Sequence, residues 1–152
     1  MNRPRWLRRG QWVPLLPPPI RHMIVGMVPL EPIARAYDYI APGDNSQTLS
    51  EVERLMPLAV WGALCLIAGA VALSGLILRR PAIAIAGLFL GGCVEAALAA
   101  GQWGVVLGVP WLDGMRGPFI ASVFAIAQIG MAGGYLLQVL DERDEREAAR
   151  EQ

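Results

Sequence analysis

The sequence predicts an all-α integral membrane protein with three transmembrane helices, preceded by a proline-rich arm and a short interfacial helix. Of its 152 residues, 55% are hydrophobic and only 17% are charged, and the mean hydropathy is +0.43. This composition is unusual for a soluble domain. The hydrophobic residues are also concentrated in three long stretches that follow a more polar first third. A chain of this length has too few residues left to cover three such helices with a polar shell, so we expect them to lie in lipid.

The predicted transmembrane domain covers residues 50–140, with helices at about 57–78, 82–108 and 118–140. The first stretch has no charged residue over about 22 positions, which at about 1.5 Å per residue is enough to cross a hydrocarbon core of about 30 Å. The second is interrupted only by Glu95 and Gln102, and the third by Ser122, Gln128 and Gln138.

Residues 1–30 form the predicted arm. Residues 1–22 contain five Arg and no acidic residue, and the prolines at positions 14 and 17–19 prevent the continuous apolar helix that a signal peptide needs. We expect an extended, polyproline-like backbone near Pro17–Pro19. An alternative is that translation begins at Met23 or Met27, which would remove this arm.

Residues 31–49 contain a short predicted helix and a loop. Glu31 to Ile40 has Pro32 in its first turn and an apolar stripe of Ile33, Ala36, Tyr37 and Ile40. We expect this helix to lie in the membrane interface, and the alternative is that it packs on the spans. A capping box at Ser50–Glu53 predicts the start of a helix that leads into the first span and that Pro57 kinks.

The last predicted segment, residues 141–152, is a charged continuation of the third helix in water. Glu142 and Arg146 are spaced i, i+4 and can attract each other.

The orientation is predicted from the shortest loop, which contains Arg79 and Arg80. Positive residues close to a span favour the cytoplasmic side, so this loop and the C-terminal tail are expected inside and the N-terminal third outside. The five Arg of residues 1–22 favour the opposite placement. Under the N-out topology, aromatic residues lie near the outer interface: Trp61, Trp103, Trp111, Tyr37 and Tyr39.

The sequence lacks the residues that common catalytic and metal-binding sites need. All thirteen basic residues are Arg, and the chain has one histidine, His22, and two cysteines, Cys65 and Cys93, with no metal-binding spacing. We therefore expect no catalytic residue, metal or cofactor, no nucleic-acid partner and no recognisable small-molecule substrate. The expected partners are the lipid bilayer and either other copies of the chain or a membrane complex.

Glu95 lies near the middle of the second predicted span, where an ionisable side chain is costly unless it is protonated, paired or in contact with water. It belongs to a stripe of small residues spaced by four: Gly87, Gly91, Glu95 and Ala99. Such stripes allow close helix packing in lipid, and the third span contains a matching pair, Gly130 and Gly134. Gln128 is predicted at nearly the same depth as Glu95, so the two can form a hydrogen-bonded pair.

Three roles for Glu95 remain open. It can fix the packing by bonding to Gln128 or to a neighbouring subunit, which we favour. It can line a pore that opens when the helices rearrange. It can also be the site of a small proton-coupled transporter, although that role usually needs more helices.

With its three spans, N-out and C-in arrangement and charged tail, the chain resembles three-span holins, phage proteins that accumulate in the bacterial inner membrane and then open lesions. It also resembles small membrane proteins of actinobacterial phages, in its lack of Lys and in the stretches VPLEPIARAYDYIAP and GVPWLDGMRGP. The resemblance implies a non-enzymatic protein that oligomerises and permeabilises the membrane. The long N-terminal third departs from holins and favours an alternative, an accessory or assembly subunit of a membrane or virion complex.

Overall fold

The computed structural model describes residues 18–41, 50–108 and 114–150, and within these ranges the chain is helical without strands. Its helices are α1 (Pro18–Met27), α2 (Leu30–Ile40), α3 (Glu51–Arg54), α4 (Leu58–Ile77), α5 (Pro81–Leu107) and α6 (Arg116–Arg150). Three of them, α4, α5 and α6, are long and apolar enough to cross a membrane. The expectation of an all-α protein with three such helices is confirmed.

The α4 and α5 helices begin and end within one residue of the predicted bounds, and α6 begins two residues before its predicted start at 118. Pro57 is the N-cap residue of α4, and Pro81 is the first residue of α5, where its missing N–H costs no helical hydrogen bond. Between them, Arg79 has a positive φ of 53° in the tight turn. α6 continues as an exposed helix to Arg150, as predicted for the charged tail.

Two local expectations are wrong. Pro18 and Pro19 begin α1 instead of an extended backbone, because proline is tolerated in the first turn of a helix. The capping box at Ser50–Glu53 is present, but α3 is a separate single turn that ends at Arg54. Pro57 therefore separates two helices and does not kink one.

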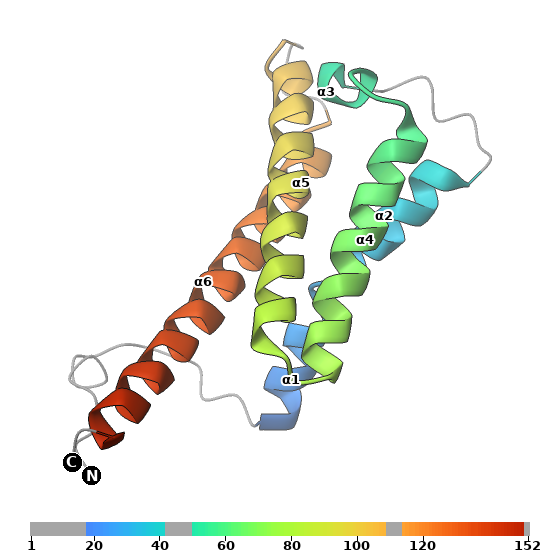
Figure 1. The fold of residues 1–152 in the computed structure, drawn as a ribbon. Helices are drawn as coiled ribbons and strands as arrows, with labels where there is room; N and C mark the ends of the chain where they lie inside the picture. The colour runs from blue at the N-terminus through green and yellow to red at the C-terminus, as the bar shows by residue number, and fades with distance from the viewer. Residues whose placement is uncertain (1–17, 42–49, 109–113, 151–152) are drawn as a thin grey trace.

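Close helix packing depends on glycines at the crossing points. A Cβ atom on Gly87 of α5 would overlap the backbone of Ala72 in α4, and one on Gly75 of α4 would overlap the backbone of Ala84 in α5. A Cβ atom on Gly92 of α5 would overlap the side chain of Ile129 in α6 and would also come close to the carbonyl oxygen of Ala125. The α5 helix thus lies between α4 and α6 and contacts both (Figure 1).

The α2 helix lies along α4 and runs in the opposite direction (Figure 1). Near its C-terminal end, Ile40 approaches Gly62, and near its N-terminal end, Ile33 and the Pro29 carbonyl approach Gly69. The α1 helix, which precedes α2 in the chain, lies at the end of the bundle that contains Arg79, where Val25 and Arg79 line one groove. The expected helix at residues 31–40 is therefore present, and it packs on the spans, which was the alternative to an interfacial position.

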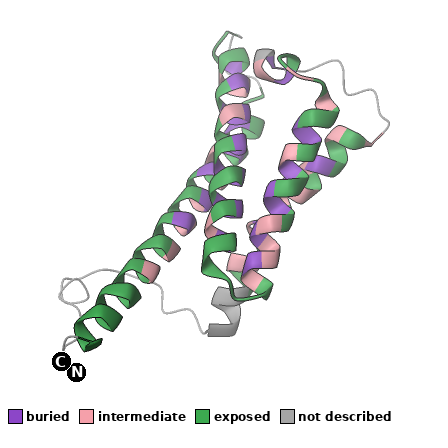
Figure 2. Ribbon diagram, viewed as in Figure 1, coloured by how far each residue is buried: buried purple, intermediate pink, exposed green. Residues whose placement is uncertain are grey.

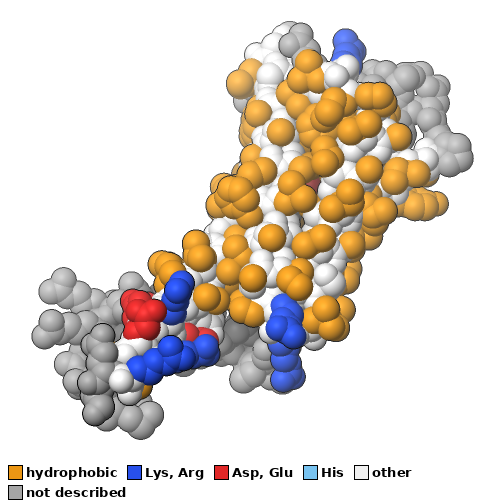
Figure 3. Space-filling view, in the orientation of Figure 1, with side chains coloured by type: hydrophobic (Ala, Val, Ile, Leu, Met, Phe, Trp, Pro, Cys, Tyr) orange, Lys and Arg blue, Asp and Glu red, His pale blue; other side chains and the backbone are white. Residues whose placement is uncertain are grey.

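The outside of the bundle is largely apolar. Hydrophobic side chains cover most of the face seen in Figure 3, and Arg side chains lie at its ends. Large hydrophobic side chains such as Ile67 of α4, Phe89 of α5 and Ile126 of α6 are exposed. Burial is confined to the narrow zone where helices face one another (Figure 2). This distribution is typical of a protein surrounded by lipid.

Candidate functional site

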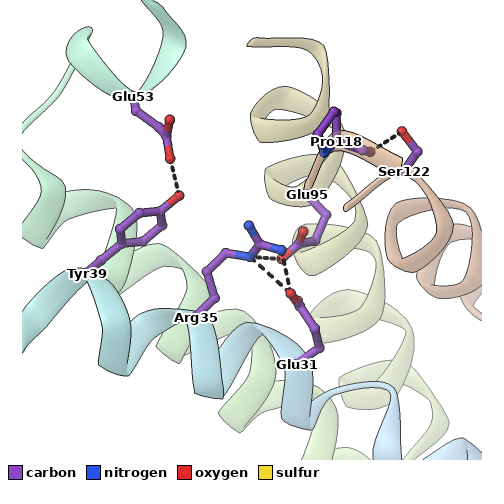
Figure 4. A network of polar contacts seen from close by, with 7 residues as sticks. All are labelled: Glu31, Arg35, Tyr39, Glu53, Glu95, Pro118 and Ser122. Atoms are coloured by element: carbon purple, nitrogen blue, oxygen red, sulfur yellow. Dashed lines mark hydrogen bonds and ion pairs between the residues drawn. The ribbon is translucent and has the colours of Figure 1, made fainter. Parts of the chain in front are cut away.

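The candidate site is a cluster of three charged side chains between α2 and α5: Glu31, Arg35 and Glu95 (Figure 4). Glu95 is completely buried, and the side chains of Glu31 and Arg35 are 17% and 16% exposed. Arg35 Nε lies 3.1 Å from Glu95 Oε1. The same guanidinium donates two hydrogen bonds to Glu31 Oε1, from Nε at 3.1 Å and from Nη2 at 2.5 Å.

The local sequence explains how α2 delivers this cluster. Glu31 and Arg35 are one helical turn apart, so both point from the same side of α2. Ala36, which is 1% exposed, brings α2 close to α4, and its carbonyl oxygen lies against Gly62. This close approach places Arg35 within reach of Glu95 on the next helix.

The cluster contains two carboxylates and one guanidinium. Burial of an ion pair removes both charges from water, and the pair repays this cost only with close contact and additional hydrogen bonds. Neither Glu95 oxygen has a hydrogen bond from any described residue, nor does Glu31 Oε2. The attraction between Arg35 and Glu95 is therefore mainly electrostatic and holds α2 against α5.

The expected hydrogen bond between Glu95 and Gln128 does not form. Gln128 is 1% exposed, but its Nε2 has no hydrogen-bond partner among the described residues. Its Oε1 lies against the Cα of Gly91, one turn before Glu95, so a Cβ at Gly91 would overlap it. Both residues are buried, and Glu95 is paired with Arg35 instead.

The predicted small-residue faces have different surroundings. Gly87, Gly91 and Ala99 are buried with Glu95 inside the chain, so this stripe packs α5 against its neighbours. Gly130 and Gly134 of α6 are exposed, and a Cβ at either would meet nothing within 4 Å. The two patterns therefore do not pack against each other within one chain.

A second set of polar contacts lies near the ends of α2 and α3. The Tyr39 hydroxyl donates to Glu53 Oε1 at 2.5 Å, and Glu53 Oε2 accepts from the Ser50 backbone N–H at 2.7 Å. Ser50 Oγ accepts in turn from the Glu53 N–H, which completes the capping box. These bonds fix α3 to α2.

The aromatic residues of the predicted interface belt differ in exposure. Trp61 is 5% exposed and lies in the core with Cys65 and Leu98, so its ring packs inside the bundle. Trp103 is half-buried and donates from Nε1 to Ser122 Oγ at 3.0 Å. Trp111 lies outside the described residues.

Tyr37 is 74% exposed, whereas Tyr39 is half-buried. The two topology residues, Arg79 and Arg80, are both exposed in the turn between α4 and α5.

Two members of the cluster, Glu31 and Arg35, were missing from the predicted site. Their i, i+4 spacing was a usable signal, because a buried Glu95 needs a cation and the rest of the predicted spans supply none at that depth. No group of His, Cys, Asp and Glu that could hold a metal ion occurs in the described part of the chain. The two cysteines are free thiols, Cys65 buried and Cys93 exposed.

The chain was compared with protein-family models, with curated proteins and with solved structures, and none of them matches. The class of protein and the candidate site are therefore defined by the helices and contacts described above. The described chain is helical, three of its helices are able to cross a membrane, and an ion pair lies inside the bundle.

Proposed function

We propose that this chain is a non-enzymatic integral protein of a bacterial cytoplasmic membrane that self-associates through α6, and that its assemblies permeabilise the membrane as holins do. The exposed glycine face of α6 is the observation that carries the self-association. Arg79–Arg80 and the charged end of α6 face the cytoplasm in this proposal, following the bias of positive residues near spans.

The α6 helix is the least covered of the three long helices. Of its most apolar 18-residue window, 22% is buried, compared with 39% for α4 and 50% for α5. Its buried side faces α5 and comprises Pro118, Ala121, Ala125, Gln128 and Ala132. At 100° per residue, Gly130 and Gly134 lie on the opposite side of the helix. A helix from a second copy can approach closely there, because the glycines present no side chain.

The Glu95 stripe is a poor candidate for the wall of a pore within one chain. Glu95 is buried and lies against Arg35. The space beside Gly87 is occupied by α4, and the space beside Gly91 is occupied by Gln128 of α6. Opening water access to Glu95 would separate the ion pair, which costs several kcal/mol in lipid. We therefore propose that lesions form between copies in contact through α6.

The experiment compares the wild type with Gly130→Leu/Gly134→Leu, in which two bulky side chains cover the α6 face. Gly104→Leu is the matched control, because Gly104 is also exposed and a Cβ atom there would meet nothing within 4 Å. Chemical cross-linking in membranes should give dimers and higher species for the wild type and for Gly104→Leu, and mostly monomers for the double variant.

Membrane potential is followed in the same cells with a fluorescent dye after induction. A sudden loss of potential in the wild type, absent in the double variant, supports the complete proposal. Cross-linked oligomers with normal growth and potential would contradict permeabilisation. Monomers with normal potential would contradict self-association too, and would favour the alternative of an accessory subunit whose partner occupies the α6 face.

A further inference from the structure

We infer that α1 and α2 together form a fourth, interrupted membrane crossing, so that residues 18 and 150 lie on the same side of the membrane. The loop between α2 and α3 would then lie on the other side. This inference concerns the topology of a single chain and does not depend on self-association or permeabilisation.

The first argument is the path of the chain along α4. Ile40 lies against Gly62, Ile33 against Gly69, and Val28 packs on the core cluster of Ala72 and Leu88. Further on, Val25 and Gly26 line the same groove as Leu76 and Arg79. From Gly62 to Arg79, α4 and its following turn advance by about 25 Å, at about 1.5 Å per residue. The α1–α2 segment accompanies α4 over this whole distance, which is most of a hydrocarbon core of about 30 Å.

The second argument is the orientation of polar and apolar side chains. Met23, Met27, Leu30 and Tyr37 are 65%, 57%, 47% and 74% exposed. The charged side chains of Glu31 and Arg35 instead face α5 and are about one-sixth exposed. A helix lying on the membrane surface would expose its charges to water and bury its apolar face. Asp38, near the C-terminal end of α2, is exposed. The other two charged side chains of α2 face inward while large apolar side chains lie on its outer face, which fits a helix whose outer face contacts lipid.

The third argument is charge. Glu31 and Glu95 both lie against the Arg35 guanidinium inside the bundle, so the charges that make residues 31–35 unsuitable for lipid face one another and not the outside. The break at Val28 and Pro29 divides the crossing into helices of 10 and 11 residues. Neither piece is long or apolar enough to be recognised as a span on its own, which explains why hydropathy indicates only three.

The fourth argument comes from the arginines that precede the crossing. Residues 1–17 contain four Arg and no acidic residue. The fifth Arg of residues 1–22, Arg21, lies in the first turn of α1. With three crossings and Arg79–Arg80 in the cytoplasm, these arginines would be outside, against the usual bias. With a fourth crossing, Pro18 lies at the Arg79 end of the bundle, and both basic segments precede or follow a span on the cytoplasmic side.

The test uses single cysteines in the full-length chain, on a Cys93→Ala background that retains the buried Cys65. Gly10→Cys and Asn45→Cys lie before and after the proposed crossing. Glu147→Cys and Asp113→Cys calibrate the two sides, because α6 separates them. A membrane-impermeant maleimide is applied to right-side-out and inside-out vesicles.

The inference predicts that Gly10→Cys is labelled in the same vesicles as Glu147→Cys, and Asn45→Cys in the same vesicles as Asp113→Cys. Labelling of Gly10→Cys and Asn45→Cys from one side would overturn it and favour three crossings with an N-terminal segment outside. Labelling of Gly10→Cys in both kinds of vesicle would also contradict it, because a fixed crossing gives one orientation. Oligomerisation and membrane potential are not readouts here, so the result is separable from the proposed function.

Discussion

Arg35 in α2 and Glu95 in α5 form an ion pair inside the helical bundle, with Nε 3.1 Å from Oε1. This pair connects the segment before the three long helices to the middle helix of the bundle. We expect it to be the most sensitive polar contact in the chain, because Glu95 has no hydrogen bond from any described residue to replace it.

Arg35→Leu should destabilise the protein by about 3–5 kcal/mol, because it leaves a buried Glu95 without a cation. Arg35→Leu/Glu95→Leu should be more stable than Arg35→Leu, since the double variant buries no unpaired Glu95. Unfolding in mixed micelles, followed by tryptophan fluorescence, measures both. Arg54→Leu is the control, because Arg54 is exposed. If the double variant were the less stable of the two, Glu95 would not depend on Arg35.

Glu95→Gln should lower the stability of the protein less than Glu95→Leu does. Glutamine keeps an oxygen that can accept from Arg35, whereas leucine leaves the guanidinium with Glu31 alone. The same unfolding measurement compares the two variants. Equal losses of stability would show that only the charge of Glu95 matters.

Gly87→Ala should lower stability by about 1–3 kcal/mol, because its new methyl group meets the backbone of Ala72, which cannot rotate away. Gly104→Ala is the matched control in the same helix, with open space at the Cβ position. It should be neutral or slightly stabilising, since alanine favours helices more than glycine does. Similar losses for both variants would contradict the close contact at Gly87.

Tyr39→Phe should cost about 1–3 kcal/mol, because it removes the hydrogen bond to a buried Glu53 and leaves that oxygen without its donor. Tyr37→Phe tests the same substitution on the same helix at a side chain that is 74% exposed, and it should change stability little. Thermal unfolding in detergent measures the difference. A Tyr39→Phe variant as stable as Tyr37→Phe would argue against the contact with Glu53.

Trp103→Phe and Ser122→Ala should be coupled by about 0.5–1.5 kcal/mol in a double-mutant cycle, as expected for a hydrogen bond between helices in lipid. The cycle uses free energies of unfolding for the wild type, both single variants and the double variant. Additive effects would show that the bond does not join α5 to α6 in the membrane.

The three long helices were predictable because each one is an almost unbroken apolar stretch, a signal that depends on the sequence alone. The capping box at Ser50–Glu53 was predictable for the same reason: its contacts are local. The pairing of Glu95 with Arg35 was missed, because Arg35 is far away in sequence and lies in a segment whose charges make it look unlike a span. Burial of Trp61 was also missed, since an aromatic residue near the end of a span suits both an interface and a core.

The contact between Arg35 and Glu95 has a consequence for the order of membrane insertion. Ribosomes synthesise Arg35 before Glu95, so α2 leaves the ribosome without the carboxylate that faces it in the finished bundle. Until Glu95 follows, Arg35 is paired only with Glu31 of its own helix, and exposing these charged side chains to hydrocarbon is costly. If α1 and α2 cross the membrane as inferred above, this segment would remain at the membrane surface until α5 is inserted, and pairing with Glu95 would then favour its entry. The first helices synthesised would be the last to reach their final position.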